Sequence, residues 1–169
     1  MKNAIKILAL LLIILLNSCK KNKTESADML TEDNLTECLK DTYCTYLYAD
    51  NAGMDGYYLT LTTGQYRVFW ANTGIGQEFF SLYFMAPMLG DRFELTKVDF
   101  TEGRVKYRNN CSTCYAVSAA PVDGKITGKK IPQVAGLPEK WLVEADVVLA
   151  VGSTNMKSIH LKQYYFRAN

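Results

Sequence analysis

The chain has 169 residues, of which 19 are basic and 17 acidic, and it carries a formal charge of +2 with a single histidine. So small a positive excess argues against nucleic acid as a partner, because nucleic-acid-binding surfaces are strongly basic. One histidine excludes a metal site built from several histidines. We expect no cofactor, because no motif of the sequence indicates a binding site for one.

The first residues of the chain have the pattern of an export signal. Lys2 and Lys6 accompany an unbroken apolar run at 7–16. This run is too short to cross a bilayer, since a spanning helix needs about 20 apolar residues. A positive start, a short apolar core and a small residue before a break are typical of a secretory signal peptide. We therefore predict a signal peptide over residues 1–18.

The next observation is the sequence Leu16-Asn17-Ser18-Cys19, which resembles the lipobox of bacterial lipoproteins. The resemblance covers this segment alone, and it implies cleavage before Cys19 and a lipid on its thiol that anchors the protein to a membrane. Lys20 follows where inner-membrane lipoproteins typically carry aspartate. The resemblance thus implies the outer membrane of a bacterial envelope, with the domain in the periplasm or at the cell surface. The alternative is an ordinary signal peptide in which Cys19 is incidental.

Beyond the signal, residues 19–28 are polar and predict a tether, and residues 29–169 are predicted to form a single domain. Removal of residues 1–18 takes away two lysines and no acid, so the basic count falls from 19 to 17 and equals the 17 acids. The mature chain is then neutral, which again argues against nucleic acid.

Four cysteines remain after Cys19, and an even number in an exported chain predicts two disulfides. Four cysteines allow three connectivities. We expect the two local pairs, because each can close without long-range folding: Cys38 with Cys44, and Cys111 with Cys114.

Taken in chain order, the first expected element is a short helix over 29–40, where Thr31 is a suitable N-cap and Leu35 and Leu39 share a face. From Cys44 onward the pattern alternates with period two between turn sequences. Strands are expected at 44–49, 57–62, 65–70, 79–85, 92–100, 105–107, 115–119, 125–131, 141–151 and 158–167. Within 92–100 the inward-facing set changes parity, which predicts a bulge or bend near Thr96 and Lys97.

About nine or ten strands at short spacing, with no helix between them, predict an all-β antiparallel fold. A sandwich and a lipocalin-like barrel both fit this pattern. The strand at 141–151 is the clearest. Its apolar residues alternate on one face, and Glu144 and Asp146 lie on the other.

Two groups of residues suggest an enzyme. The Cys111-Ser112-Thr113-Cys114 spacing is that of thiol oxidoreductases, but no helix is expected after it, so a structural disulfide is favoured over redox or zinc chemistry. Glu144 and Asp146 would lie about 7 Å apart on a strand, within the range of glycosidase carboxylates. An outward acidic pair is more often a solvated surface, and His160 is likewise expected to face solvent.

Aromatic residues suggest a binding protein instead. Nine of the 20 aromatic residues lie between 57 and 84. We expect Tyr58, Arg67 and Phe69 to be exposed and to bind a glycan, a lipid or another apolar ligand, or a protein. The alternative is that these residues form the core.

The sequence therefore predicts a lipid-anchored envelope protein with a non-enzymatic binding or interaction domain. Two alternatives stay open. One is an envelope enzyme, acting through Cys111 and Cys114 or through Glu144 and Asp146. The other is a purely structural envelope lipoprotein.

Overall fold

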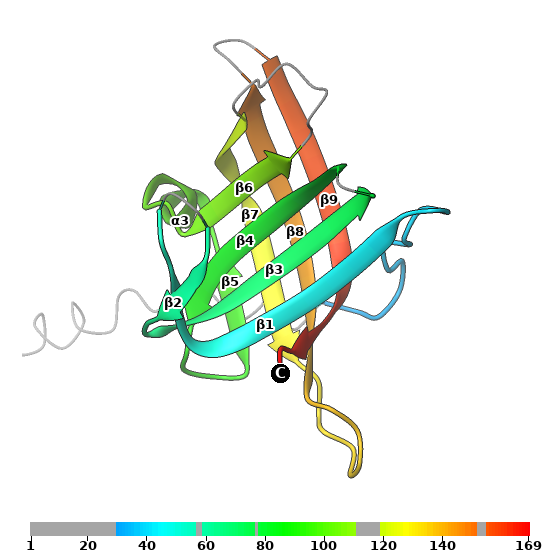
Figure 1. The fold of residues 1–169 in the computed structure, drawn as a ribbon. Coiled ribbons are helices and arrows are strands. Elements are labelled where there is room, and N and C mark those ends of the chain that lie inside the picture. The colour runs from blue at the N-terminus through cyan, green and yellow to red at the C-terminus, as the bar shows by residue number, and fades with distance from the viewer. Residues whose placement is uncertain (1–29, 57–58, 77, 111–118, 152–154) are drawn as a thin grey trace, which may run out of the picture.

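The structure is a computed structural model that describes residues 30–56, 59–76, 78–110, 119–151 and 155–169 (Figure 1). The expected all-β fold is confirmed, because strands account for most of these residues and α3 (Lys97–Thr101) is the one helix among them. The strands are β1 (Tyr43–Met54), β2 (Leu61–Thr63), β3 (Tyr66–Ile75), β4 (Glu78–Pro87), β5 (Arg92–Leu95), β6 (Val105–Asn110), β7 (Ala119–Lys130), β8 (Lys140–Val151) and β9 (Asn155–Arg167).

All of these strands belong to a single sheet in the order β5-β7-β8-β9-β1-β3-β4-β6, with β2 paired to the end of β1. The sheet curls into a half-barrel, so that β1, β3, β4 and β6 cross in front of β5, β7, β8 and β9 (Figure 1). The expectation of a wholly antiparallel sheet is wrong at one place. β9 runs parallel to β1, with Leu47 opposite Phe166 and the Ala168 N–H donating to the Tyr48 carbonyl at 2.9 Å.

The concave face of the sheet is packed with large rings. Phe69 lies at the centre, with its ring centroid 5.1–5.7 Å from those of five others: Tyr48, Phe84, Phe93, Trp141 and Tyr165. Gly128 lies beneath this cluster, where a Cβ atom would overlap the Phe93 ring. Such a filled interior supplies the main apolar burial of the fold.

The alternation predicted for residues 141–151 is confirmed. The inward-facing side chains from Trp141 to Leu149 are at most 1% exposed. β8 pairs with β7 and β9 along nearly its whole length, so both neighbours fix its position.

The helix predicted over 29–40 is wrong, because residues 30–42 contain no helix. Thr36 bonds to β9 instead: its N–H donates to the Lys162 carbonyl, and its hydroxyl accepts from the Lys162 N–H, both at 2.8 Å. Asn34 and Asp41 have positive φ angles of 57° and 62°, which interrupt a right-handed helix. Tertiary hydrogen bonds thus outweigh the local helical pattern.

Of the bulge or bend predicted near Thr96 and Lys97, the bulge is wrong, because the strand ends there instead of continuing. β5 ends at Leu95, and the change of parity marks the start of α3. The Asp99 carboxylate accepts a hydrogen bond from the Thr96 N–H at 2.6 Å, which caps the helix, and it pairs with Arg104 at 2.6 Å.

Candidate functional site

The candidate site lies where the two ends of the curled sheet approach each other without pairing. Among the described residues, β6 is hydrogen-bonded to β4 on one side only. β7 is paired with β5 only from Ile126 onward, so its first residues, 119–125, have no strand partner on that side among the described residues. The half-barrel is therefore open along a seam between β6 and the first half of β7.

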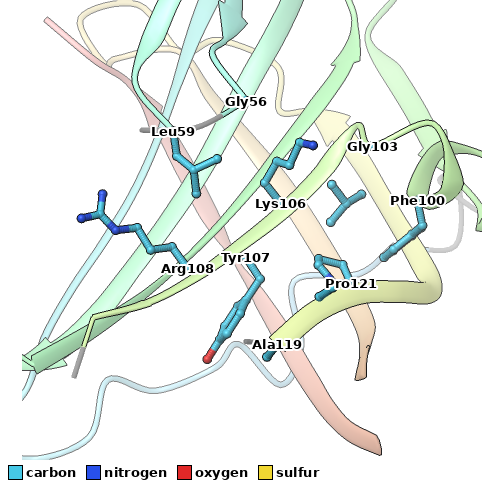
Figure 2. A pocket seen from close by; sticks show the side chains of 11 residues that line it. Gly56, Leu59, Phe100, Gly103, Lys106, Tyr107, Arg108, Ala119 and Pro121 are labelled. Carbon is cyan, nitrogen blue, oxygen red and sulfur yellow. The ribbon is translucent and has the colours of Figure 1, made fainter. Parts of the chain in front are cut away.

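A groove of about 550 Å³ occupies this seam (Figure 2). The described residues that line it come from β6, from the start of β7, from the end of α3 and its connection to β6, and from the connection between β1 and β2. They are Gly56, Leu59, Phe100, Gly103, Val105, Lys106, Tyr107, Arg108, Ala119, Ala120 and Pro121.

The two sides of the groove differ because side chains alternate along β6. Val105 and Tyr107 point toward the concave face, where Tyr107 packs against the core. Lys106 and Arg108 lie on the other face of the strand, together with Leu59 (Figure 2). The groove thus has an apolar inner wall and a cationic outer rim.

No acidic residue is present among the described residues that line the groove. Lys106 forms no ion pair with a described residue, and its Nζ lies beside Gly103, 3.0 Å from where a Cβ atom would stand. The Arg108 guanidinium lies 6.0 Å from the Phe79 ring centroid. Burial raises the pKa of the Tyr107 hydroxyl, which stays neutral at physiological pH. The charge of the rim is therefore positive.

Helix α3 packs against β7 at the end of the seam where β6 begins. Lys97 pairs with Asp123 of β7 at 3.1 Å. Gly124 has a φ of 146°, and a Cβ atom there would overlap the Asp146 carbonyl and the Phe100 ring. Only glycine permits this close approach of helix and strand.

The expected exposure of Arg67 and Phe69 is wrong. Phe69 is fully buried and Arg67 is 7% exposed. Arg67 Nε pairs with Asp50 at 2.6 Å, and its guanidinium lies 4.4 Å from the Trp141 ring centroid. Both side chains fill the concave face, and neither lines the groove. Tyr58, the third residue expected to bind a ligand, lies outside the described residues.

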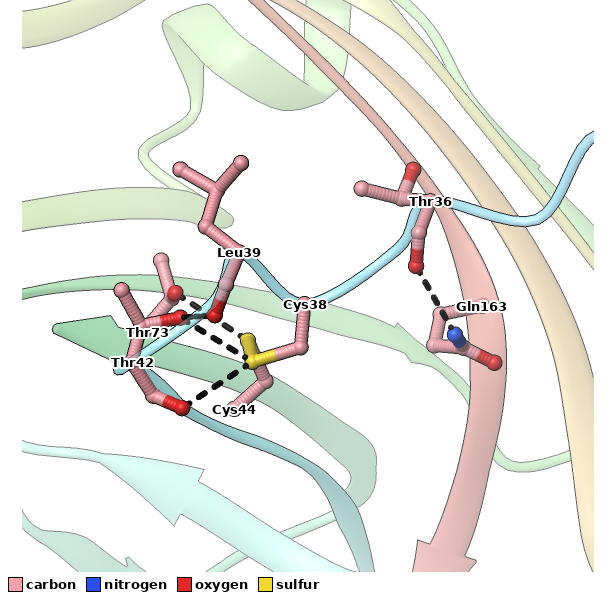
Figure 3. The surroundings of a disulfide bond; sticks show 7 residues. All are labelled: Thr36, Cys38, Leu39, Thr42, Cys44, Thr73 and Gln163. Atoms are coloured by element: carbon pink, nitrogen blue, oxygen red, sulfur yellow. Dashed lines mark hydrogen bonds between the residues drawn. A yellow bond between two sulfur atoms is a disulfide. The ribbon is translucent and has the colours of Figure 1, made fainter.

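The predicted disulfide between Cys38 and Cys44 is confirmed, with a Cα separation of 5.9 Å (Figure 3). Thr73 Oγ1 of β3 lies 3.2 Å from Cys44 Sγ and holds the bridge against the sheet. The predicted pair of Cys111 and Cys114 lies outside the described residues, as does the lipidation candidate Cys19.

The two carboxylates considered for glycosidase chemistry lie on the outer face of β8. The Glu144 carboxylate lies 3.9 Å from Lys162 Nζ. The Asp146 carboxylate lies 2.7 Å from His160 Nδ1. Asp146 and His160 are both more than half exposed, as expected for a solvated surface. Neither carboxylate lines the groove.

The described residues hold no group of three or more potential metal ligands. Within the same residues, no helix has the length and apolar character needed to cross a bilayer. Comparisons with protein families, with curated proteins and with solved structures find no match to this chain. The fold and the groove must therefore carry the functional argument by themselves.

Sequence reasoning did not identify the groove residues. The one available signal was that the strand around Val105 and Tyr107 is short and carries Lys106 and Arg108 on its other face. Short strands with exposed charges are typical of sheet edges. The partner wall, Ala119–Pro121, is brought to that edge only by the curl of the sheet.

Proposed function

We propose that this protein is a lipid-anchored component of the bacterial outer membrane whose β domain binds a ligand without catalysing a reaction. The groove between β6 and β7 carries the proposal. It offers about 550 Å³ at an unpaired sheet edge, which lies within the range of about 300–1,000 Å³ that is usual for small-molecule sites.

The chemistry of the walls suggests the class of ligand. Tyr107, Pro121 and Phe100 offer apolar surface on the inner side, and Lys106 offers a cation with no ion-pair partner among the described residues. An apolar molecule with an anionic group, such as a fatty acid or another acidic amphiphile, would bury its chain against the inner wall. Its acidic group would then pair with the Lys106 ammonium.

A fluorescent probe with the same chemistry tests the proposal. Anilinonaphthalene sulfonate joins apolar rings to a sulfonate, and its emission rises when the rings leave water. We expect Lys106→Gln to weaken its binding about tenfold through loss of a charged hydrogen bond. Tyr107→Ala is expected to weaken it through loss of the apolar wall. Lys157→Gln, a change at an exposed lysine of β9, is the matched control.

Equal affinity of the wild type, Lys106→Gln and Tyr107→Ala would reject the groove as the site. Circular dichroism of each variant excludes a loss of fold as the cause of weaker binding. Fatty acids that displace the probe would then identify the natural class of ligand.

The anchor is tested separately. Mass spectrometry of the protein from bacterial membranes is expected to show an acylated N-terminal Cys19, and Cys19→Ser is expected to abolish it. An unmodified Cys19, or a processed chain that begins elsewhere, would contradict the lipoprotein assignment.

A further inference from the structure

One end of the half-barrel, which we call the basal end, presents apolar side chains on two adjacent connections. The hairpin 131–139 joins β7 to β8, and the turn 88–91 joins β4 to β5. The Lys130 N–H donates to the Asp91 carbonyl at 2.7 Å, so the two connections lie side by side. The hairpin projects beyond the sheet at the end where the C-terminus lies (Figure 1).

The tips of these connections are exposed and uncharged. Leu89 is 88% exposed, Val134 is 62% exposed and Leu137 is 57% exposed. Residues 131–138 contain no charged side chain. Single exposed apolar side chains are ordinary, but three on adjacent tips of one end indicate a contact surface.

An ion network beneath the hairpin neutralises the carboxylates there. Glu139 pairs with Lys130 and accepts a hydrogen bond from Tyr48 Oη at 2.5 Å. Asp50 pairs with Arg67 and Arg167, each at 2.6 Å. The hairpin thus stands on a base whose acidic groups are already paired.

Two lysines beside the hairpin lie outside this ion network. Lys129 and Lys140 flank the hairpin and form no ion pair with a described residue, although Lys140 Nζ lies 3.7 Å from the Tyr164 ring centroid. The other acids toward this end are Asp91, the terminal carboxylate of Asn169, and Glu32 and Asp33 of the first described segment. An apolar tip between two available lysines complements a surface that is apolar within and anionic at its boundary.

The described chain also begins toward this end. Thr36 bonds to Lys162, and Glu32 accepts a hydrogen bond from Tyr164, which is two residues closer to the end of β9. The chain therefore reaches Leu30 on the basal side, and residues 20–29 connect it to Cys19. An attachment at Cys19 would leave the domain from the same end as the hairpin.

We propose that the basal end docks on an anionic bilayer, with Val134, Leu137 and Leu89 in the boundary between headgroups and acyl chains and with Lys129 and Lys140 at the phosphates. The proposal rests on the proposed function only for the presence of a membrane. A lipid at Cys19 holds the domain near the bilayer, and the hairpin supplies the contact that orients it. The docking surface is distinct from the groove. Pro121 of the groove lies about 30 Å from Ile131 at the base of the hairpin, because ten residues of extended strand separate the two.

The opposite end has exposed apolar residues too, among them Leu39, Ile75 and Met156. Its charged side chains include both acids and bases, namely Glu37, Lys40, Asp41, Glu78 and Lys157, so charge does not separate the two ends. The bilayer is assigned to the basal end because the described chain begins toward that end, and an anchor at Cys19 would hold that end near the membrane.

The test uses the processed, acylated protein purified from bacterial membranes and reconstituted in vesicles that contain phosphatidylglycerol and brominated phosphatidylcholine. Bromine quenches tryptophan only at the depth of the acyl chains. Val134→Trp adds a tryptophan, and we expect the brominated lipid to quench the fluorescence that this residue adds to that of the wild type. The same result is expected for Leu89→Trp. Met156→Trp is the matched control, because Met156 is 69% exposed at the far end of β9.

The lysines are tested on the Val134→Trp background. Each change to glutamine, at Lys129 and at Lys140, is expected to lower the ratio of inserted to free hairpin about fivefold on anionic vesicles. On vesicles of phosphatidylcholine alone, the changes are expected to have no such effect.

Unquenched Val134→Trp in a chain that floats with the vesicles would overturn the docking proposal and leave the anchor standing. Equal quenching of Val134→Trp and Met156→Trp would overturn it as well, because the domain would then have no preferred end. A chain that does not float with the vesicles would overturn both the anchor and the docking surface.

Discussion

Strands β8 and β6 both place apolar residues at alternate positions on the concave face, but their surroundings differ. β8 is paired on both sides along nearly its whole length, and its inward residues, from Trp141 to Leu149, are at most 1% exposed. Within the part of the chain that the structure describes, β6 is paired with β4 alone, and the groove, lined by Tyr107 and Lys106, lies along its other edge.

The comparison shows that alternation determines which face a residue occupies, whereas pairing determines whether that face is closed. Strands with neighbours on both sides contribute to a filled core. A strand at an unpaired edge leaves part of its apolar face available to a ligand. The half-barrel thus keeps stability and binding in different parts of one sheet.

The largest expected effect lies in the closed region. Phe69→Ala removes a ring that contacts five others and should lower the free energy of unfolding by about 3–5 kcal/mol. Phe166→Ala, at a ring that is 40% exposed, should change it by about 0.5 kcal/mol or less. Urea denaturation measures both. A small effect of Phe69→Ala would contradict its place at the centre of the core.

A matched pair of valines tests the comparison directly. Val143 of β8 and Val105 of β6 are both at most 2% exposed. Val143→Ala should cost about 2–3 kcal/mol and Val105→Ala only about 1 kcal/mol, because a free strand edge relaxes around the lost methyl groups more easily. Equal costs would show that the seam is packed as rigidly as the core.

The disulfide at the start of β1 should contribute a smaller amount to the free energy of unfolding. The bridge joins Cys38 to Cys44, which are separated by six positions in the sequence. Its loss in the double variant Cys38→Ser, Cys44→Ser should cost about 2 kcal/mol of stability. Differential scanning calorimetry of the double variant and the wild type measures the change, and probe binding in the groove should be unaffected.

The smallest expected effect depends on pH. Burial alone would raise the pKa of Glu139, but hydrogen bonds from Lys130 and Tyr48 outweigh burial, and the pKa lies below its ordinary value of 4.5. The folded state therefore gains stability from ionised Glu139 above pH 4.5 and loses it as the pH falls through the lowered pKa. Urea midpoints of the wild type and Glu139→Gln, measured from pH 6 down to pH 3, should converge at the acidic end.

Several features of the fold could be predicted from residues close in sequence. The faces of β8 follow from the alternation of Val143, Ala145 and Val147 with the acidic neighbours Glu144 and Asp146. The bridge between Cys38 and Cys44 needs only a local turn. The outward positions of Glu144 and Asp146 follow from the same alternation.

The exposure of Arg67 and Phe69 could not be predicted correctly, for a reason that the sheet makes clear. Arg67 and Phe69 are out of phase with Leu59, Leu61 and Val68, which suggests that they lie on the exposed face. Leu61, however, belongs to β2, which pairs with β1 and not with β3. Val68, on the opposite face of β3, is also fully buried. A strand that is covered on both faces gives no periodic signal of which face is inside.

The sequence by itself determined that this chain forms strands, which residues share a face of β8 and which cysteines near the N-terminus can pair. These properties depend on backbone geometry within a few residues. Only the tertiary structure decided that β9 lies parallel to β1, that Arg67 and Phe69 are buried, and that a groove opens between β6 and β7. These properties depend on which distant strands lie beside one another, and the curl of the sheet sets that arrangement.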